Sequence, residues 1–310
     1  MEEKLFLICG YGATGAEDMA IYALRESSVV KRFGMIHGRA PSFACRGTNG
    51  LIYIASERED GSDITAYALE GGALRPVRTL QTPGTALCHL CAHGDVIYGS
   101  CYGSGDYFAV DADLTQVLWQ FCPENAHAHW VTVVQQQAYL ADLGNDCLYG
   151  WTLAGNLPTG NGALLRQKEG SGPRQPLNTS VGLLCINELD GTLRLLDTQG
   201  VPLCEATASR QHEPRNYPGG ACLDNNGLAW VCNRGPNTLS AWQVQDASLK
   251  PMGEYPTGNW PRMVAALPGT DVLAVACQRE DEVRLYRRCG STLAELYRLP
   301  LPGAACILPL

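Results

Sequence analysis

Short apolar runs separated by turn residues recur along the chain. Each copy has a short strand, a turn, a second and more apolar strand that ends in polar residues, and then a third strand. The copies that begin at Pro173, Tyr217 and Trp260 are the clearest, and fainter ones begin near Ala40, Thr85 and Ala128. None contains a ten-residue amphipathic run. The pattern therefore predicts strands joined by turns rather than helices.

The copies repeat with a nearly constant period. In each copy a polar residue closes the second strand, and these residues are Ser56, Ser100, Asp142, Asn187, Asn233 and Gln278. Successive members are 42 to 46 residues apart. A period of about 40 to 50 residues with three or four strands per copy is typical of the blades of a β-propeller.

The two ends of the chain supply one more copy. The apolar run at residues 4–10 is a second strand without a first, and PGAACILPL at residues 302–310 is a strand with nothing after it. Pairing them, with the last strand innermost, removes the open sheet edges that an array would otherwise expose. We therefore predict an all-β, seven-bladed β-propeller that forms a single domain over residues 1–310.

The glycines of LFLICGYGATG match a nucleotide-binding motif, but their context does not. Gly10, Gly12 and Gly15 have the G-x-G-x-x-G spacing of a loop that binds a dinucleotide pyrophosphate. That fold next needs a helix, and then a strand that ends in an acidic residue about 20 positions later. The sequence instead continues MAIYAL and VVKRFGMIHG, which ends without an acid. We interpret the stretch as the connection between two strands of a blade.

Composition and charge exclude several classes of function. The 310 residues include 34 Gly and 18 Pro, only 17% are charged, and the net charge of −8 comes without any clustered Lys/Arg stretch. This argues against a nucleic-acid partner. The N-terminus lacks a basic region, and its apolar run is too short for a signal segment or a membrane span. We therefore expect a cytoplasmic location and no membrane partner.

Fourteen cysteines are spread through apolar runs, which favours buried free thiols over a disulfide framework. Cys88 and Cys91 form a single C-x-x-C without a second pair at zinc-ligand spacing. If they lie in a strand, their thiols point to opposite faces. We do not expect them to bind a metal.

Polar side chains at one end of the blades are the candidates for chemistry. The first two strands of a blade are antiparallel, so the first strand starts where the second ends, at the mouth of the central channel. These places hold Ser56, Glu57, Ser100, Tyr102, His129, Asp142, Arg174, Asn187, Glu188, Asn233, Arg234, Arg262 and Gln278. Three arginines in an acidic chain favour an anionic small-molecule substrate. For Asn187, Asn233 and Gln278 we favour a structural role, because amides are suited to bracing the backbone. His127 would share a strand face with His129.

Four segments resemble the seven-bladed propeller lactonases. They are HAHWV…YLADLGNDCLYGW, GPRQ…CINELDGTL, CNRGPNTLSAW and WPRMVAALPGTDVLAVACQREDEVRLY, and the similarity covers essentially the whole chain. That family includes 6-phosphogluconolactonases and the fungal carboxymuconate lactonizing enzymes (cycloisomerases). The resemblance implies a site at His129, Arg174, Glu188 and Arg234, with Arg262 and Gln278 nearby. The chain departs from the family pattern at Gln175, where His is usual, and at Trp130, where Ser is usual.

Hydrolysis of a sugar-acid lactone is the activity that we expect, with 6-phosphogluconolactone as the first candidate. Glu188 or His129 would be the general base that activates water, and His127 is an alternative to His129. Arg174 and Arg234 would stabilise the oxyanion or bind a phosphate, in either order. The further residues expected to contact the substrate are Arg262, Gln278, Asn187, Asn233, Asp142 and His127.

Two other functions stay open at this point. A lactonizing enzyme would use the same arginines to bind carboxylates, whereas a propeller scaffold would have no catalytic residues. The oxygen atoms of Asp142, Asn187, Glu188 and Asn233 are of the kind that binds calcium, but the neighbouring arginines would repel a cation. We therefore expect no metal and no cofactor, and a monomer or a weak dimer.

Overall fold

The computed structural model describes residues 3–26, 28–290 and 292–310. In these residues, strands β1 to β28 form seven four-stranded antiparallel sheets. One short 3-10 helix, η1 (Gln278–Glu280), connects two strands of the last of these sheets along the chain. This confirms the predicted seven-bladed β-propeller. The chain divides into two compact units, which we call unit 1 (Met1–His37 with Leu177–Leu310) and unit 2 (Gly38–Pro176).

The sheets of unit 2 are blades 2 to 4. Blade 2 contains β4 (Pro41–Arg46), β5 (Ile52–Arg58), β6 (Gly61–Glu70) and β7 (Ala73–Thr82). Blade 3 contains β8 (Leu87–His93), β9 (Val96–Cys101), β10 (Tyr107–Asp111) and β11 (Val117–Phe121). Blade 4 contains β12 (Ala128–Val134), β13 (Gln137–Asp142), β14 (Cys147–Ala154) and β15 (Leu157–Arg166).

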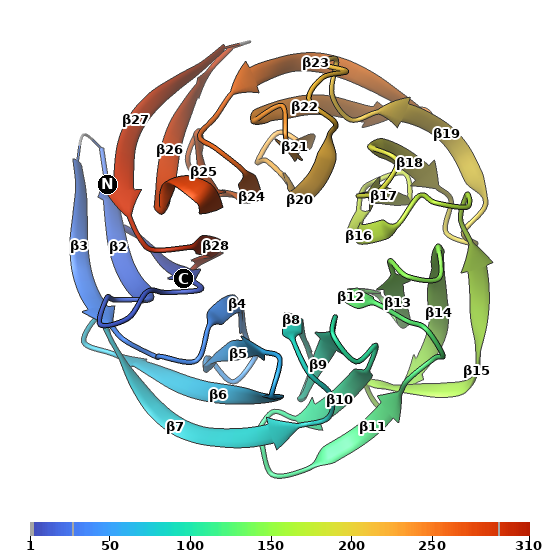
Figure 1. Cartoon of the computed structure of the whole chain (residues 1–310), viewed down its shortest axis with the longest axis horizontal. Coiled ribbons are helices and arrows are strands. Elements are labelled where there is room, and N and C mark those ends of the chain that lie inside the picture. The colour runs from blue at the N-terminus through green and yellow to red at the C-terminus, as the bar shows by residue number, and fades with distance from the viewer. Residues whose placement is uncertain (1–2, 27, 291) are drawn as a thin grey trace. The chain divides into compact units, whose positions relative to one another are not determined.

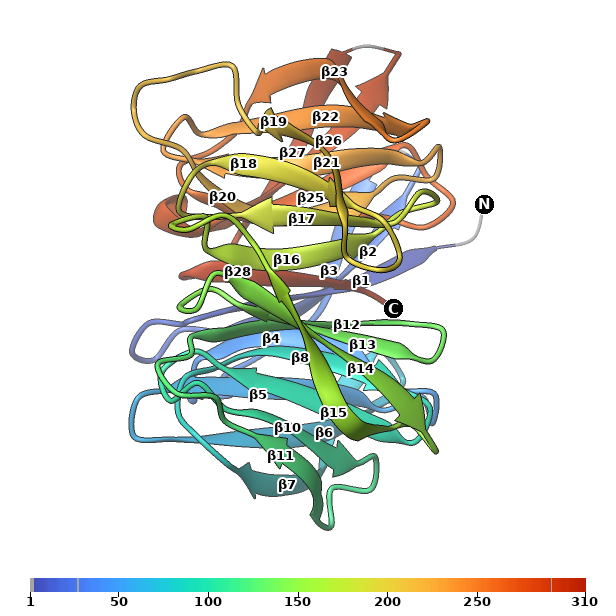
Figure 2. The same cartoon turned by 90° about the vertical axis from the view of Figure 1, so that its right-hand side faces the viewer.

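The remaining sheets are blades 5, 6, 7 and 1. Blade 5 contains β16 (Pro173–Asn178), β17 (Leu183–Asn187), β18 (Thr192–Leu196) and β19 (Pro202–Thr207). Blade 6 contains β20 (Tyr217–Leu223), β21 (Leu228–Arg234), β22 (Thr238–Gln245) and β23 (Ser248–Pro256), whose order is visible in Figure 2. Blade 7 contains β24 (Pro261–Ala266), β25 (Val272–Cys277), β26 (Glu282–Cys289) and β27 (Thr292–Pro300). Blade 1 contains β28 (Ala304–Pro309), β1 (Lys4–Gly10), β2 (Met19–Arg25) and β3 (Ser28–Met35).

The two ends of the chain meet in blade 1, as the sequence predicts. β28 is the first strand of that sheet and pairs antiparallel with β1, with Phe6 opposite Pro309 and Gly10 opposite Ala304. Figure 1 shows β28 beside the N-terminal strands. The N–H of Leu310 donates to the carbonyl of Leu5 at 3.0 Å. The last strand of the chain therefore covers an edge that β1 would otherwise leave open.

Burial explains why the second strand of each copy is the most apolar. Strands such as β9 and β25 are buried along their whole length, whereas the outer strand β7 is mostly exposed. Because these middle strands are buried on both faces, every position in them favours an apolar side chain. In unit 1, Phe6 and Ile8 of blade 1 belong to the same core cluster as Val283 and Leu285 of blade 7.

The glycine-rich segment connects β1 to β2, which confirms the interpretation made from the sequence. A Cβ on Gly10 would come within 2.5 Å of the carbonyl oxygen of Pro302, and Gly12 and Gly15 have positive φ. The N–H of Gly12 donates to the same Pro302 carbonyl at 3.1 Å. These glycines therefore accommodate the C-terminal strand and a tight connection.

The cysteines are free thiols, and most of them are buried or half-buried. Cys88 and Cys91 both lie in β8, and burial raises the pKa of the Cys91 thiol to about 11. A thiol with so high a pKa stays protonated at neutral pH, which makes it a poor nucleophile. Within the described residues, no helix has the length and apolar character that a membrane span requires.

Candidate functional site

The start of the first strand lies beside the end of the second strand, as expected. In five blades the residue before the first strand has a left-handed backbone, and these residues are Ala40, Ala86, Gly172, Trp260 and Gly303. In four of these blades the carbonyl of this residue accepts a hydrogen bond from a backbone N–H at or just after the end of the second strand. Ala40 accepts from Glu57 at 3.0 Å, and Trp260 accepts from Gln278 at 3.2 Å. In blade 4 the His127 carbonyl accepts the same bond from Leu143.

A β-bulge then changes the direction of the second residue of the first strand. The pairing register shifts between Ala128 and Trp130 in β12, and between Pro261 and Met263 in β24. The extra residue is His129 in the first case and Arg262 in the second. Bulges re-aim side chains and are common beside active sites. Two of the predicted site residues therefore share a position that is specialised by backbone geometry.

The predicted repeat is wrong by one residue in two blades. Cys101 pairs with Leu87, and Cys277 pairs with Pro261, so these cysteines close the second strands rather than Ser100 and Gln278. Gln278 instead begins η1. The sequence analysis chose the polar neighbour in both cases, Ser100 and Gln278, because it expected a polar residue at the end of the strand. A buried strand can instead end in a cysteine.

Glu188 and Arg234 form an ion pair within unit 1. Arg234 Nη2 lies 2.9 Å from Glu188 Oε1, and the two side chains are only 4% and 17% exposed. Arg234 also donates from Nε to the Tyr217 carbonyl at 2.8 Å and from Nη2 to the Pro218 carbonyl at 3.1 Å. These bonds fix the guanidinium of Arg234. The Glu188 carboxylate lies next to it and keeps a small solvent-exposed surface.

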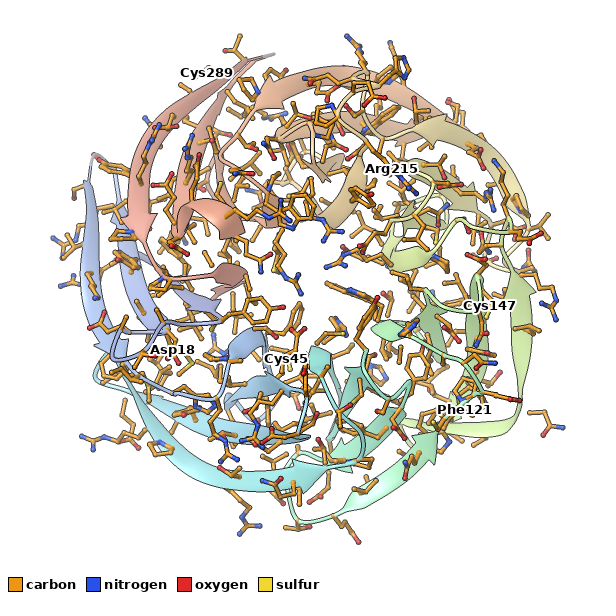
Figure 3. The ribbon with its side chains drawn as sticks, in the orientation of Figure 1. Asp18, Cys45, Phe121, Cys147, Arg215 and Cys289 are labelled. Carbon is orange, nitrogen blue, oxygen red and sulfur yellow. The ribbon has the colours of Figure 1, made fainter. Side chains whose placement is uncertain are left out.

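A cluster of arginines and aromatic rings surrounds this pair in unit 1. The Arg279 guanidinium carbon lies 3.5 Å from the centroid of the Trp260 ring, and that of Arg234 lies 5.4 Å from it. The Tyr217 ring is 6.2 Å from Trp260, and Arg215 lies 5.0 Å from the Tyr217 centroid. Figure 3 shows Arg215 between the ribbons of blades 5 and 6. We call Arg215, Tyr217, Trp260 and Arg279 the arginine–aromatic cluster.

Sequence reasoning missed this cluster. Arg279 directly follows Gln278, and Trp260 is the first residue of a repeat copy, but the pattern does not show which side chains stack. Arg262, which the sequence did select, lies 5.2 Å from the centroid of the Tyr11 ring, also in unit 1.

The backbone of Trp260 is strained. Its φ is 59°, and a bulky residue in this left-handed region costs on the order of 1–2 kcal/mol.

Three predicted polar residues hydrogen-bond within the fold. Asp142 Oδ1 accepts from the backbone N–H groups of His127, Gly144 and Asn145 at 3.0–3.1 Å. Asn187 donates to Thr192, and Asn233 donates to Thr238 and Ser240. All three side chains are fully buried. Asn187 and Asn233 brace the connections between strands, as their amide groups suggested, and Asp142 does the same through its carboxylate. A contact with substrate stays a prediction for all three.

The two histidines of unit 2 lie beside Tyr102. His127 is exposed, precedes β12 and stacks on the Tyr102 ring with centroids 4.8 Å apart, while its Nδ1 is 3.1 Å from the Tyr102 carbonyl. His129 is 4% exposed and meets the same ring edge-on at 6.0 Å. The ring of Tyr102 therefore fixes both imidazoles, and the buried His129 is the more constrained of the two.

Another histidine, His89, is buried in an aromatic cluster of unit 2. Its ring stacks on Trp130 with centroids 3.7 Å apart and lies 4.5 Å from Phe43. Its Nδ1 accepts the N–H of Val131 at 3.2 Å, just after the bulge that carries His129. Desolvation and, secondarily, the positive charge of Arg174 hold the pKa of His89 well below 6.5. Arg174 is itself buried, at 6% exposure.

The lowered pKa of His89 predicts a loss of stability in mild acid. Below pH 6.5 the unfolded chain binds a proton that the folded chain excludes, so the free energy of unfolding falls by up to about 1.4 kcal/mol per pH unit. In His89→Gln this contribution is absent, and the melting temperature should fall less between pH 7.5 and 5.5. The exposed His212→Gln is the control and should behave as wild type. An NMR titration of His89 with a midpoint near 6.5 would contradict the prediction.

A cavity of about 520 Å³ in unit 1 lies at the other ends of the strands, among Lys4, Arg25 and Arg287. None of the predicted site residues lines it. Among the described residues, no three His, Cys, Asp or Glu side chains are grouped so that they could hold a metal ion.

The chain is similar in sequence or in fold to several known proteins. The sequence model of a family described as "Lactonase, 7-bladed beta-propeller" matches residues 6–308. A candidate 6-phosphogluconolactonase from Bacteroides fragilis has a TM-score of 0.90 and 18% identity, over 99% of this chain and 98% of that one. The periplasmic gluconolactonase of Pseudomonas aeruginosa has a TM-score of 0.88 and 18% identity, over 100% and 99%. Comparison with curated protein sequences gave no match.

Proposed function

The chain belongs to the lactonase family of seven-bladed β-propellers, and on that premise we propose that it hydrolyses a sugar-acid lactone. The observation that carries the proposal is the Glu188–Arg234 ion pair, which is nearly buried and fixed by two backbone carbonyls. Hydrolysis of a cyclic ester needs a base for water and a positive group for the oxyanion. This pair supplies both types of group.

In the proposed reaction, Glu188 accepts a proton from water as the water oxygen attacks the lactone carbonyl. Negative charge then develops on the carbonyl oxygen, and the guanidinium of Arg234 stabilises it without reorganising. The ring C–O bond breaks, and the leaving alkoxide takes the proton from Glu188 to become the free hydroxyl. Participation of His129 and Arg174 of unit 2 stays a prediction, and His129→Gln is the variant that tests it.

We propose 6-phosphogluconolactone as the substrate. The arginines around Glu188 favour an anionic ligand in a chain of net charge −8. The B. fragilis structure is a candidate for the same activity, and the P. aeruginosa one is a gluconolactonase. The proposal also includes three expectations from the sequence. These are a cytoplasmic location, catalysis without a metal, and a monomer or weak dimer.

The test is an assay of the purified protein at pH 6.5–7, with spontaneous hydrolysis subtracted. We expect kcat/KM for 6-phosphogluconolactone of at least about 10⁴ M⁻¹ s⁻¹, unchanged by excess chelator. A rate equal to that of buffer would refute the activity. Conversion of a carboxymuconate instead would assign the lactonizing reaction, and a lack of activity on both would favour a binding scaffold.

A further inference from the structure

Blade 7 has a tryptophan at a position where other blades have small residues. In the other blades with a left-handed residue before the first strand, that residue is Ala40, Ala86, Gly172 or Gly303. In blade 7 it is Trp260, whose backbone N–H donates to Asn237 Oδ1 at 2.9 Å and whose backbone carbonyl accepts from the N–H of Gln278 at 3.2 Å. Strained residues held in this way concentrate at ligand-binding sites. Since alanine is sufficient for the fold elsewhere, the indole needs a separate explanation.

Trp260 supports an arginine that has no acidic partner. Arg279 is exposed and lies over the Trp260 ring at 3.5 Å from the centroid. Within the described part of the chain, no acidic side chain forms an ion pair with it, and its sequence neighbour Glu280 pairs with Arg284 instead. A guanidinium stacked on a ring keeps its N–H edges for a ligand, and its planar fork fits a carboxylate or a phosphate.

A second exposed cation, Arg215, belongs to the same cluster. Arg215 lies over Tyr217, whose ring is in turn 6.2 Å from Trp260, and it donates a hydrogen bond to the Leu189 carbonyl. Among the residues that the structure describes, no acidic side chain forms an ion pair with Arg215. Arg215 and Arg279 therefore create a locally positive surface on an acidic protein, which attracts anions.

The cluster is joined to the proposed reaction centre by Trp260. The guanidinium carbons of Arg234 and Arg279 lie 5.4 Å and 3.5 Å from the centre of the same ring. They are therefore no more than about 9 Å apart, a distance that a six-carbon chain can bridge. A ligand whose carbonyl carbon is next to Arg234 can place a second anionic group at Arg279.

We propose that Trp260, Arg279 and Arg215 form a subsite for an anionic group of the substrate that is remote from the reacting ester. This proposal rests on the proposed function for the identity of the reacting group. The shared ligand chemistry is a phosphate or a carboxylate at the far end of an aldonolactone. The subsite selects charged lactones over neutral ones, and Trp260 positions Arg279 rather than contacting the reacting atoms.

The experiment compares three lactones: neutral gluconolactone, 6-phosphogluconolactone and glucaro-1,4-lactone, which carries a remote carboxylate. The variants are Arg279→Gln, Arg279→Lys and Trp260→Ala, which restores the residue type found in blades 2 and 3. Arg287→Gln removes the same charge at the other end of unit 1 and is the control. Binding of inorganic phosphate to each protein is measured by calorimetry.

For Arg279→Gln we expect KM for the preferred charged lactone to rise about 10- to 100-fold, the range for a lost charge-assisted contact. Its kcat, and both constants for gluconolactone, should change less than twofold. Lysine should restore part of the affinity, and Trp260→Ala should behave like a milder form of the glutamine variant. The charged lactone whose KM rises more, 6-phosphogluconolactone or glucaro-1,4-lactone, shows whether the subsite binds a phosphate or a carboxylate. An equal change for the charged and neutral lactones, or an equal effect of Arg287→Gln, would overturn the subsite.

The two proposals fail separately. If the wild type hydrolyses no lactone but binds phosphate in a manner that depends on Arg279, the subsite stands and the proposed function falls. If lactones are hydrolysed and Arg279→Gln equals wild type on all three, the subsite falls and the function stands.

Discussion

Replacing Glu188 with glutamine is expected to lower kcat for lactone hydrolysis by about 10²- to 10⁴-fold. The amide keeps the shape of the side chain but cannot accept a proton from water. Arg234 retains its bonds to the Tyr217 and Pro218 carbonyls in the variant, so its position should be preserved. The measurement is steady-state hydrolysis, together with thermal unfolding to show that the variant is folded.

Glu70→Gln is the matched control for this experiment. Glu70 makes an exposed ion pair with Arg75 in the β6–β7 hairpin of unit 2, so the same chemical change there should leave kcat unaltered. An unchanged kcat in Glu188→Gln would show that the base lies elsewhere. A large loss in His129→Gln would then assign the base to His129.

Removing residues 303–310 is expected to have the largest effect on stability. This deletes β28, whose residues Ala304 to Ile307 are almost fully buried, and uncovers one edge of β1. Burial of a side chain such as Ile307 is worth about 1.5–3 kcal/mol, and the lost strand pairing adds to that. A typical folded protein is stable by only about 5–15 kcal/mol. We therefore expect denaturant unfolding at a much lower concentration, or loss of soluble protein.

A pair of glycine variants tests the same strand without deleting it. Gly10→Ala should destabilise the protein strongly, because its new Cβ would approach the Pro302 carbonyl oxygen to 2.5 Å. Gly15→Ala is the control, since it has a positive φ but nothing within 4 Å of its new Cβ, and it should cost only about 1 kcal/mol. Equal unfolding midpoints for the truncated and full-length chains would contradict the importance of β28.

The fold was largely predictable because the order of apolar and polar residues along the chain follows the burial of the strands. Middle strands are buried on both faces, so the apolar runs recur once per blade and give the period. The incomplete copies at the two ends then predict the β28–β1 pairing. Glu188 and Arg234 could be selected as candidates because each directly follows an asparagine that ends a buried apolar run.

Parts of the site could not be predicted because they depend on neighbours in space. The bulge at His129 is visible only in the pairing with β13, and the stacking of Arg279 on Trp260 joins η1 to the start of β24. Cys101 and Cys277 close their strands with apolar side chains, so a rule based on polarity misplaces the register by one residue. His89 showed no feature in the sequence that would reveal its burial between Phe43 and Trp130.

The meeting of the two chain ends in blade 1 has a practical consequence for engineering. Lys4 and Leu310 lie at the end of the sheet opposite to Gly10, and Gly10 is next to Tyr11, over which Arg262 lies. An affinity tag or a fused protein at either terminus would thus project away from Tyr11 and Arg262. A short linker between the termini would also allow new ends to be opened at an exposed hairpin, giving circularly permuted forms with the same sheets.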